Sequence, residues 1–152
     1  MSTKALGQII GDKQLIKQLE SLTSSSRELR RQKKSIVQKG LTVLKRAVKR
    51  VVPVDDGDLR KSITTKLLLN YEALGIVGVD KNYVSVDEDG QKSIPVAYDH
   101  LQEFGYTLPN GTSVPGKHYM VNAQNQSKRE VQTAMVTQTN KVIQRLLAKN
   151  RR

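Results

Sequence analysis

Helical sequence gives way to strand-like sequence within residues 52–63, Val52-Pro53-Val54-Asp55-Asp56-Gly57-Asp58-Leu59-Arg60-Lys61-Ser62-Ile63. Pro53 blocks the continuation of a helix because it has no amide proton and clashes with the preceding turn. Gly57 permits a tight reversal, since glycine adopts a positive φ without steric cost, and the neighbouring aspartates favour turns. We therefore predict that a helix ends at about residue 52 and that the chain turns there into a sheet.

The clearest predicted helix lies immediately before this turn. Ser26 is expected to cap it, and residues that can face a core recur at steps of three and four until Pro53 stops the helix. These residues are Leu29, Ile36, Val37, Gly40, Leu41, Leu44, Val48 and Val51. Upstream, Asp12 is expected to cap a shorter helix that carries Leu15, Ile16, Leu19 and Leu22 on one face and is broken by the serine run at 24–26.

Ten basic side chains occupy the opposite face of the long predicted helix, with Glu28 as the one acidic residue among them. We call them the basic surface: Arg27, Arg30, Arg31, Lys33, Lys34, Lys39, Lys45, Arg46, Lys49 and Arg50. One carboxylate cannot pair ten cations, so ion pairing along the helix does not explain the pattern. The pattern favours an acidic counter-surface, either nucleic acid or protein, over simple solvation. Contact with nucleic acid would involve phosphates and be independent of base sequence.

The middle of the chain changes to short β-branched segments. We expect strands in Leu59–Leu69, Ala73–Val79 and Tyr83–Val86, with turns near Asn70 and Asp80. A short helix is expected over Val96–Phe104, begun by Pro95 and ended by Gly105, followed by a loop with a hairpin tip at Asn110-Gly111. A final helix is expected from about Tyr119.

This order predicts an α+β fold in a single domain over residues 1–152. Residues 1–52 are expected to be helical, residues 53–116 mainly β with a long exposed loop at 107–116, and residues 117–152 helical. The strands are expected to form an antiparallel sheet of about four strands, on which the C-terminal helix packs.

Charge separates along these three parts, although the chain as a whole has a net charge of +12. Residues 1–52 hold 13 basic and 3 acidic side chains, residues 53–116 hold 5 and 10, and residues 117–152 hold 8 and 1. The chain has no cysteine, which excludes disulfides and thiolate metal sites. It also lacks an apolar stretch long enough to span a membrane, so we expect a soluble protein made in a reducing cytoplasm.

Residue types that could support chemistry are present, but their spacing does not form a recognisable site. His100 and Glu103, three apart on the short helix, could share a metal only with further ligands. The aspartates around Gly57 lack the pattern of a calcium loop. A metal-dependent nuclease would need convergence of Asp58, Asp87, Glu88, Asp89 and Lys92, for which the sequence gives no spacing signal. We therefore predict no catalytic, cofactor or metal site.

Three ordered blocks carry a resemblance to a known family. Residues 52–63 resemble the "APVDTGRLRKSI" signature of the tail-completion, or head-to-tail joining, family of long-tailed bacteriophages, the group of neck proteins that includes the minor tail protein Z of lambda. Tyr98-Asp99-His100-Leu101-Gln102-Glu103-Phe104-Gly105 is similar to the family's "YAxfxEFGT". Pro115-Gly116-Lys117-His118-Tyr119-Met120-Val121-Asn122-Ala123 is similar to its "PARPFLRPA". Asp56 replaces the usual Thr, and Lys117-His118-Tyr119 replaces Arg-Pro-Phe.

The resemblance implies a structural virion protein of the neck or upper tail and no catalytic activity. It implies a ring of identical subunits, a hexamer, around the DNA channel, in contact with a connector or stopper and with a tail terminator or tail tube. The motif positions expected to be structural are Pro53, Asp55, Gly57, Leu59, Arg60, Ser62, Ile63, Tyr98, Glu103, Phe104 and Gly105. Phe104, the single Phe, is expected in the core or in a subunit contact. The alternatives from the residues alone are a cytoplasmic, sequence-independent DNA-binding protein and the nuclease.

Overall fold

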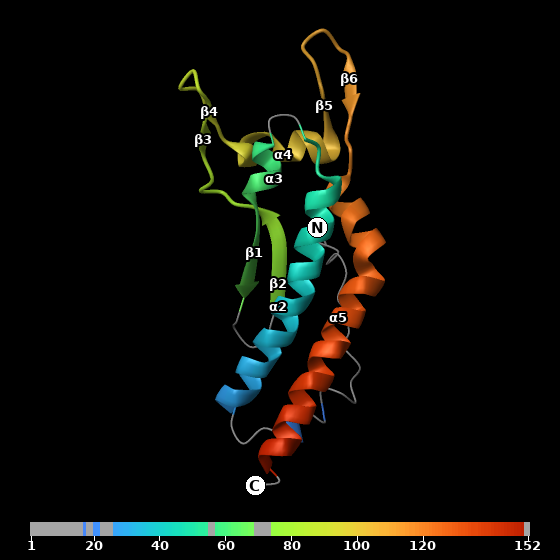
Figure 1. Cartoon of the computed structure of the whole chain (residues 1–152). Helices are drawn as coiled ribbons and strands as arrows, with labels where there is room; N and C mark the ends of the chain where they lie inside the picture. Colours follow the sequence, from blue (N-terminus) through green and yellow to red (C-terminus); the bar gives the residue numbers. More distant parts are fainter. Residues whose placement is uncertain (1–16, 18–19, 22–25, 55–56, 69–73, 151–152) are drawn as a thin grey trace.

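Figure 1 shows the computed structural model of the chain, which describes residue 17 and residues 20–21, 26–54, 57–68 and 74–150. In chain order its elements are α2 (Ser26–Val51), α3 (Asp58–Ser62), β1 (Ile63–Leu68), β2 (Leu74–Val79), β3 (Ser85–Val86), β4 (Lys92–Ser93), α4 (Pro95–Phe104), β5 (Gly105–Thr107), β6 (Ser113–Pro115) and α5 (Tyr119–Asn150). The predicted α+β class is confirmed. The turn predicted at Asn70 lies outside the described residues. So does the helix predicted after Asp12, apart from Lys17, Glu20 and Ser21, which are helical.

The helix α2 lies between the β1–β2 ribbon and α5 and contacts both (Figure 1). It ends at Val51, as the proline two residues later predicts. Its core-facing side chains divide between the two neighbours. Leu41 lies against Gly75 of β2, whereas Ile36 packs with Val142 and Leu146 of α5. The helix α2 therefore connects the sheet to the second long helix.

The main core lies where the C-terminal end of α2 meets α3, β1 and the start of α5. Its buried side chains are Val48, Val52, Leu59, Ile63, Tyr119 and Ala123. Val77 and Val79 of β2 pack against this cluster from the sheet. Residues separated by up to 75 positions thus share one apolar cluster, which fixes the upper half of the molecule.

The described strands form three two-stranded antiparallel ribbons, β1–β2, β3–β4 and β5–β6. This differs from the predicted sheet of about four strands, and α5 packs chiefly on α2 and not on a sheet. One cause is α3, which takes the first residues of the longest predicted strand. Leu59, Ser62 and Ile63 are buried at three- and four-residue spacing, a helical pattern, so β1 begins only at Ile63. The β3–β4 and β5–β6 hairpins project from the two ends of α4 (Figure 1).

The helix α5 buries two hydroxyl side chains along its contact side. Ser127 and Thr139 are 3% and 8% exposed. The Ser127 hydroxyl donates to the Ala123 carbonyl at 2.7 Å, and the Thr139 hydroxyl donates to the Met135 carbonyl at 2.9 Å. Each hydroxyl is therefore satisfied by its own helix, which makes a polar residue acceptable at a buried position. These positions explain why the apolar stripe of α5 is blurred in the sequence.

Candidate functional site

The first motif block forms the turn and the short helix that lead into the sheet. Gly57 precedes α3 with a φ of 84°, the left-handed conformation expected of it. Leu59, Ser62 and Ile63 point into the core, whereas Arg60 is exposed. Pro53 is half-buried beside this turn, and Asp55 lies outside the described residues. The roles expected for these positions in assembly remain predictions.

Asp58 links α3 to the β3–β4 hairpin. Its carboxylate accepts a hydrogen bond from the Ser85 hydroxyl of β3 and contacts the Lys61 ammonium at 3.3 Å. The hydrogen bond from Ser85 is the main reason why the pKa of Asp58 lies below its ordinary value, with Lys61 and Ser93 adding to it. Asp58 therefore holds the base of a hairpin that starts 27 residues further along the chain.

Glu103 of the second block binds the start of α5, the helix begun by the third block. The Glu103 side chain is 5% exposed. Its Oε2 accepts a hydrogen bond from the Met120 amide at 2.9 Å, and its Oε1 accepts one from the Val121 amide at 3.4 Å. The first amides of a helix have no partner within the helix, and they carry partial positive charge. Glu103 supplies both the acceptors and the opposite charge.

The backbones of the second and third blocks also approach each other closely. The Lys117 amide donates to the Gln102 carbonyl at 2.8 Å, and the His118 amide donates to the Glu103 carbonyl at 3.1 Å. A Cβ on Gly116 would lie 2.3 Å from the Glu103 carbonyl oxygen, and Gly105 has a φ of 83°. Glycine is required at both positions, because backbone atoms could not move aside. The two blocks form one rigid junction between α4 and α5.

Tyr119 completes this junction from the α5 side. Its ring is 1% exposed, and its hydroxyl donates a hydrogen bond to the Asp99 carboxylate of α4. Burial raises the pKa of the Tyr119 hydroxyl, and the hydrogen bond to Asp99 raises it further. Tyr119 therefore stays neutral and acts as a donor, and no sequence signal connects it to Asp99, 20 residues earlier.

Phe104 is exposed, which corrects the prediction that it belongs to the core. Its side chain is 71% exposed and meets the His118 ring edge-on, with ring centroids 6.4 Å apart. The neighbouring Glu103 takes the buried position because its carboxylate is needed at the start of α5. The alternative interpretation of Phe104, a subunit contact, remains open.

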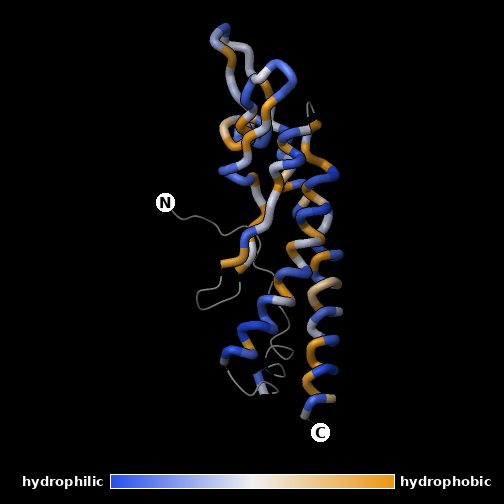
Figure 2. Tube along the Cα trace, turned by 60° about the vertical axis from the view of Figure 1, so that its left-hand side comes forward, coloured by the Kyte–Doolittle hydropathy of each residue, from blue (hydrophilic) through white to orange (hydrophobic). Residues whose placement is uncertain are grey.

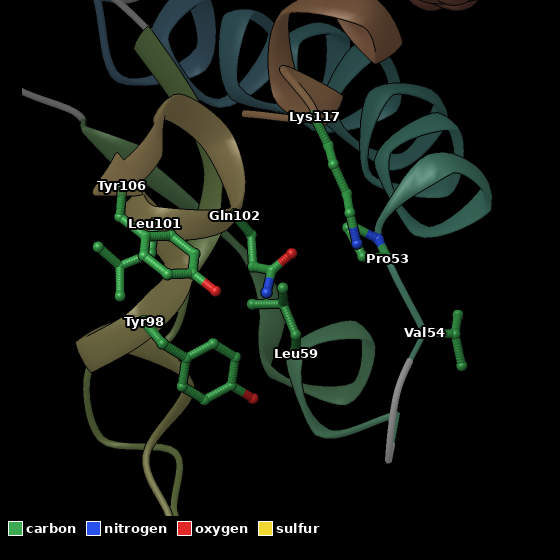
Figure 3. A pocket seen from close by; sticks show the side chains of 8 residues that line it. All are labelled: Pro53, Val54, Leu59, Tyr98, Leu101, Gln102, Tyr106 and Lys117. Atoms are coloured by element: carbon green, nitrogen blue, oxygen red, sulfur yellow. The ribbon is translucent and has the colours of Figure 1, made fainter. Parts of the chain in front are cut away.

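A pocket of about 520 Å³ opens between α3, α4 and the junction (Figure 3). Its floor and walls come from Leu59 of α3 and from Tyr98, Leu101 and Gln102 of α4, and its rim from Pro53, Val54, Tyr106 and Lys117. Val54 and Tyr106 are 63% and 40% exposed. Lys117, at a position where the family signature has Arg, extends toward Pro53 across the opening (Figure 3). The sequence predicted the motif residues but gave no indication of a pocket between them.

The basic surface lies on α2 and is accessible to solvent. Its exposed members are Arg27, Arg30, Arg31, Lys34, Lys39, Arg46 and Arg50, and its half-buried members are Lys33, Lys45 and Lys49. The N-terminal end of α2 extends beyond the β1–β2 ribbon (Figure 1) and is strongly hydrophilic (Figure 2). Among described residues, Lys33 alone of these ten forms an ion pair, with Glu20 at 3.5 Å.

Positive charge accumulates where α2 meets α3. Burial lowers the pKa of Lys49, and repulsion from Lys45 and from Arg60 of α3 lowers it further. Glu28, the acidic residue of the basic surface, is directed elsewhere and pairs with Lys149 of α5 at 3.2 Å. Within the described ranges, Lys45, Lys49 and Arg60 have no ion pair. The site can attract an anionic group from outside the molecule.

The structure does not bring together the residues considered for metal chemistry. His100 is exposed, whereas Glu103 is buried and occupied by the α5 amides. Asp58 is held by Ser85 and Lys61, and Glu88 and Asp89 lie at the exposed tip of the β3–β4 hairpin. In the described part of the chain, no three His, Asp or Glu side chains are grouped closely enough to hold a metal ion. The nuclease interpretation therefore has no geometric support from these residues.

Comparison with known proteins gives one match. The model of a family described as "Bacteriophage HK97-gp10, putative tail-component" matches residues 13–105. No curated protein and no solved structure matches the chain significantly. Among the described helices, none combines the length and the apolar content needed to cross a membrane.

Proposed function

The chain belongs to the HK97-gp10-like family of bacteriophage tail components, whose model covers residues 13–105, and on this premise we propose that it completes the tail in the neck of the particle. As a tail component it is part of the virion and interacts with other virion proteins. The proposal adds that copies form a ring around the DNA channel, where heads and tails are joined. We propose a structural role without catalysis.

The observation that carries this proposal is the junction between α4 and α5. Glu103, Gly105 and Gly116 fix two motif blocks against each other. The same rigid junction leaves Phe104 and the pocket rim exposed. A rigid element that displays apolar side chains to solvent is typical of a protein-binding surface. A subunit contact would bury these side chains in the assembled neck.

The basic surface supports a position beside the channel. DNA passing through a ring presents phosphates at every step, and exposed Lys and Arg side chains contact phosphate without reading sequence. Such contacts would be non-specific. The protein partners we propose are further copies of the chain, a connector or stopper above it, and a tail terminator or tail tube below it.

Deletion of the gene tests the proposed role. Cells infected with phage that lack this gene should accumulate heads filled with DNA and separate tails, because the joining component is missing. Expression of the intact chain from a plasmid should restore infectious particles. Normal joined particles in the absence of the chain would contradict the proposal.

The exposed end of α2 also favours a second candidate, a sequence-independent DNA-binding protein that acts in the cytoplasm. Purified particles distinguish the two candidates. Stoichiometric amounts of the chain in washed particles support the neck component. Tight, salt-sensitive DNA binding by the isolated chain, together with its absence from washed particles, would favour the cytoplasmic protein.

A further inference from the structure

The β3–β4 hairpin presents an acidic tip and apolar flanks to solvent. Asp87, Glu88 and Asp89 form the tip, and all three side chains are exposed. Val84, which precedes β3, and Val86 of β3 are 49% and 59% exposed. The hairpin stands away from the two long helices (Figure 1). A two-stranded hairpin is only marginally stable by itself, so packing against another surface would stabilise it.

The pocket offers the complementary combination of surfaces. Leu59, Leu101 and Val54 supply apolar walls, and the exposed Lys117 lies at the rim. Within the described residues, Lys117 forms no ion pair. A volume of about 520 Å³ is sufficient for several side chains of an inserted peptide.

We propose that the pocket receives the β3–β4 hairpin of a second copy of this chain. Charge complementarity selects this hairpin, since its acidic tip would meet Lys117 while its valines contact the apolar walls. The β5–β6 hairpin is the other projecting element. Its tip, residues 108–112, is Leu-Pro-Asn-Gly-Thr and carries no charge, so it offers no partner for the Lys117 ammonium.

The arrangement has a consequence for symmetry. The hairpin and the pocket are different parts of the same chain, so each copy gives one contact and receives one. Such a contact is heterologous, and it closes into a ring when the rotation between copies divides a full turn. This inference rests on the proposed ring and names the contact that would build it.

Cysteine cross-linking tests the contact directly, because the natural chain contains no cysteine. One variant carries Glu88→Cys at the tip, and the other carries Lys117→Cys at the rim. A disulfide forms only between residues whose Cα atoms lie within about 7 Å. Mild oxidation of the two variants together, in concentrated solution and in particles that contain both, should give a covalent dimer that neither variant gives alone. Asn110→Cys on the other hairpin, mixed with Lys117→Cys, is the matched control and should give none.

The outcomes separate this inference from the ring itself. A lysine cross-linker shows whether copies of the chain are neighbours in particles, because it then links them into a ladder of multimers. If this ladder forms but the 88–117 disulfide is absent in both settings, the hairpin contact is overturned and the ring is left intact. A 110–117 product would also overturn it, because the other hairpin would then fill the pocket. Copies that cannot be linked to each other in particles at all would overturn the ring together with the contact.

Discussion

Glu103 combines a buried carboxylate with the start of the longest helix. Ordinarily, burial of a carboxylate is costly because it loses contact with water. Here the amides of Met120 and Val121 replace water, and their helix contributes partial positive charge at the same place. The side chain thereby decides where α5 begins relative to α4. Its effect on the fold is larger than its single position suggests.

Substitution of Glu103 should destabilise the chain in a graded way. Glu103→Ala leaves both amides unpaired in a buried place and should lower the free energy of unfolding by about 2 kcal/mol. Glu103→Gln keeps one acceptor and should cost less. Urea unfolding followed by far-UV circular dichroism measures both. Glu130→Gln, an exposed glutamate on α5, is the control and should change stability little. Equal stability of Glu103→Ala and wild type would contradict the capping role.

Phe104 should matter for assembly and not for folding. Its 71% exposure predicts that Phe104→Ser changes the free energy of unfolding by less than about 0.5 kcal/mol. Ile63→Ala, at a position 1% exposed, should instead cost roughly 2 to 5 kcal/mol. Thermal unfolding compares the two variants. We expect phage carrying Phe104→Ser to yield fewer joined particles. A normal yield would show that the Phe104 side chain does not take part in a subunit contact.

Asp58 predicts a pH dependence of stability. Because hydrogen bonding lowers its folded pKa below the ordinary 3.8, the folded chain binds this proton less readily than the unfolded chain. Its contribution is therefore fully present above the unfolded pKa and is lost as the pH falls through the lowered folded pKa. Asp58→Asn should flatten this acid limb of a stability–pH curve measured by urea unfolding. Asp89→Asn, at the exposed tip of the β3–β4 hairpin, is the control. An unchanged acid limb in Asp58→Asn would refute the link.

The sequence predicted where helices begin and end better than it predicted long-range contacts. Pro53, Gly57, Pro95 and Gly105 act through local backbone geometry, and the helices end or begin beside them. The binding of Glu103 to the α5 amides depends on the third dimension, and nothing in the spacing of residues 103 and 120 indicates it. The same reason explains why the sequence left two roles for Phe104, core or subunit contact, since hydrophobicity alone does not distinguish a buried side chain from one at an interface; its exposure excludes the core within the single chain.

At the level of elements, the predicted strands were longer than those observed, as for β1, which spans Ile63–Leu68 and not Leu59–Leu69. One sheet and three ribbons could not be distinguished from the residue pattern, because the pairing partner of each strand depends on how α3 and α4 place it. The packing of α5 on α2 was also missed, because Ser127 and Thr139 occupy buried positions that sequence patterns treat as polar. The helices α2, α4 and α5, which have local start or stop signals, were predicted correctly.

At Gly40, side chains of α5 pack directly against the backbone of α2. A Cβ placed there would lie 2.8 Å from the Met135 Sδ and 3.4 Å from a Val131 methyl. Gly40→Val should push the helices apart and lower the free energy of unfolding by about 1 to 3 kcal/mol. Met135→Ala in the same chain should recover part of the loss, because it removes the clashing thioether. Thr42→Val, on the exposed side of α2, is the control. Additive effects of the Gly40 and Met135 substitutions in urea unfolding would rule out this contact.

At the scale of the whole molecule, charge is segregated in space as well as in sequence. The N-terminal part of the basic surface lies at the end of the molecule opposite the β3–β4 hairpin, whose exposed tip is acidic (Figure 1). A molecule with separated charges is attracted to DNA and also to the oppositely charged end of another copy. The net charge of +12 therefore does not decide which partner the basic surface meets. The dependence of DNA binding on salt can decide it.

Two variants with the same net charge separate local contact from general attraction. The first replaces Lys45, Arg46, Lys49 and Arg50 of α2 with Gln. The second replaces four exposed cations of α5, Lys128, Arg129, Lys141 and Arg145, with Gln. Each phosphate contact contributes about 0.9 to the slope of the logarithm of affinity against the logarithm of salt concentration.

If the basic surface lies on DNA, the α2 variant should reduce this slope by up to about 3.6 and the α5 variant should reduce it far less. Fluorescence anisotropy with a short labelled duplex at several salt concentrations provides the slopes. Equal reductions would mean that net charge alone attracts the chain. An unchanged slope in the α2 variant, combined with a loss of joined particles, would assign the basic surface to a neighbouring protein, because DNA contact and assembly would then depend on different parts of the molecule.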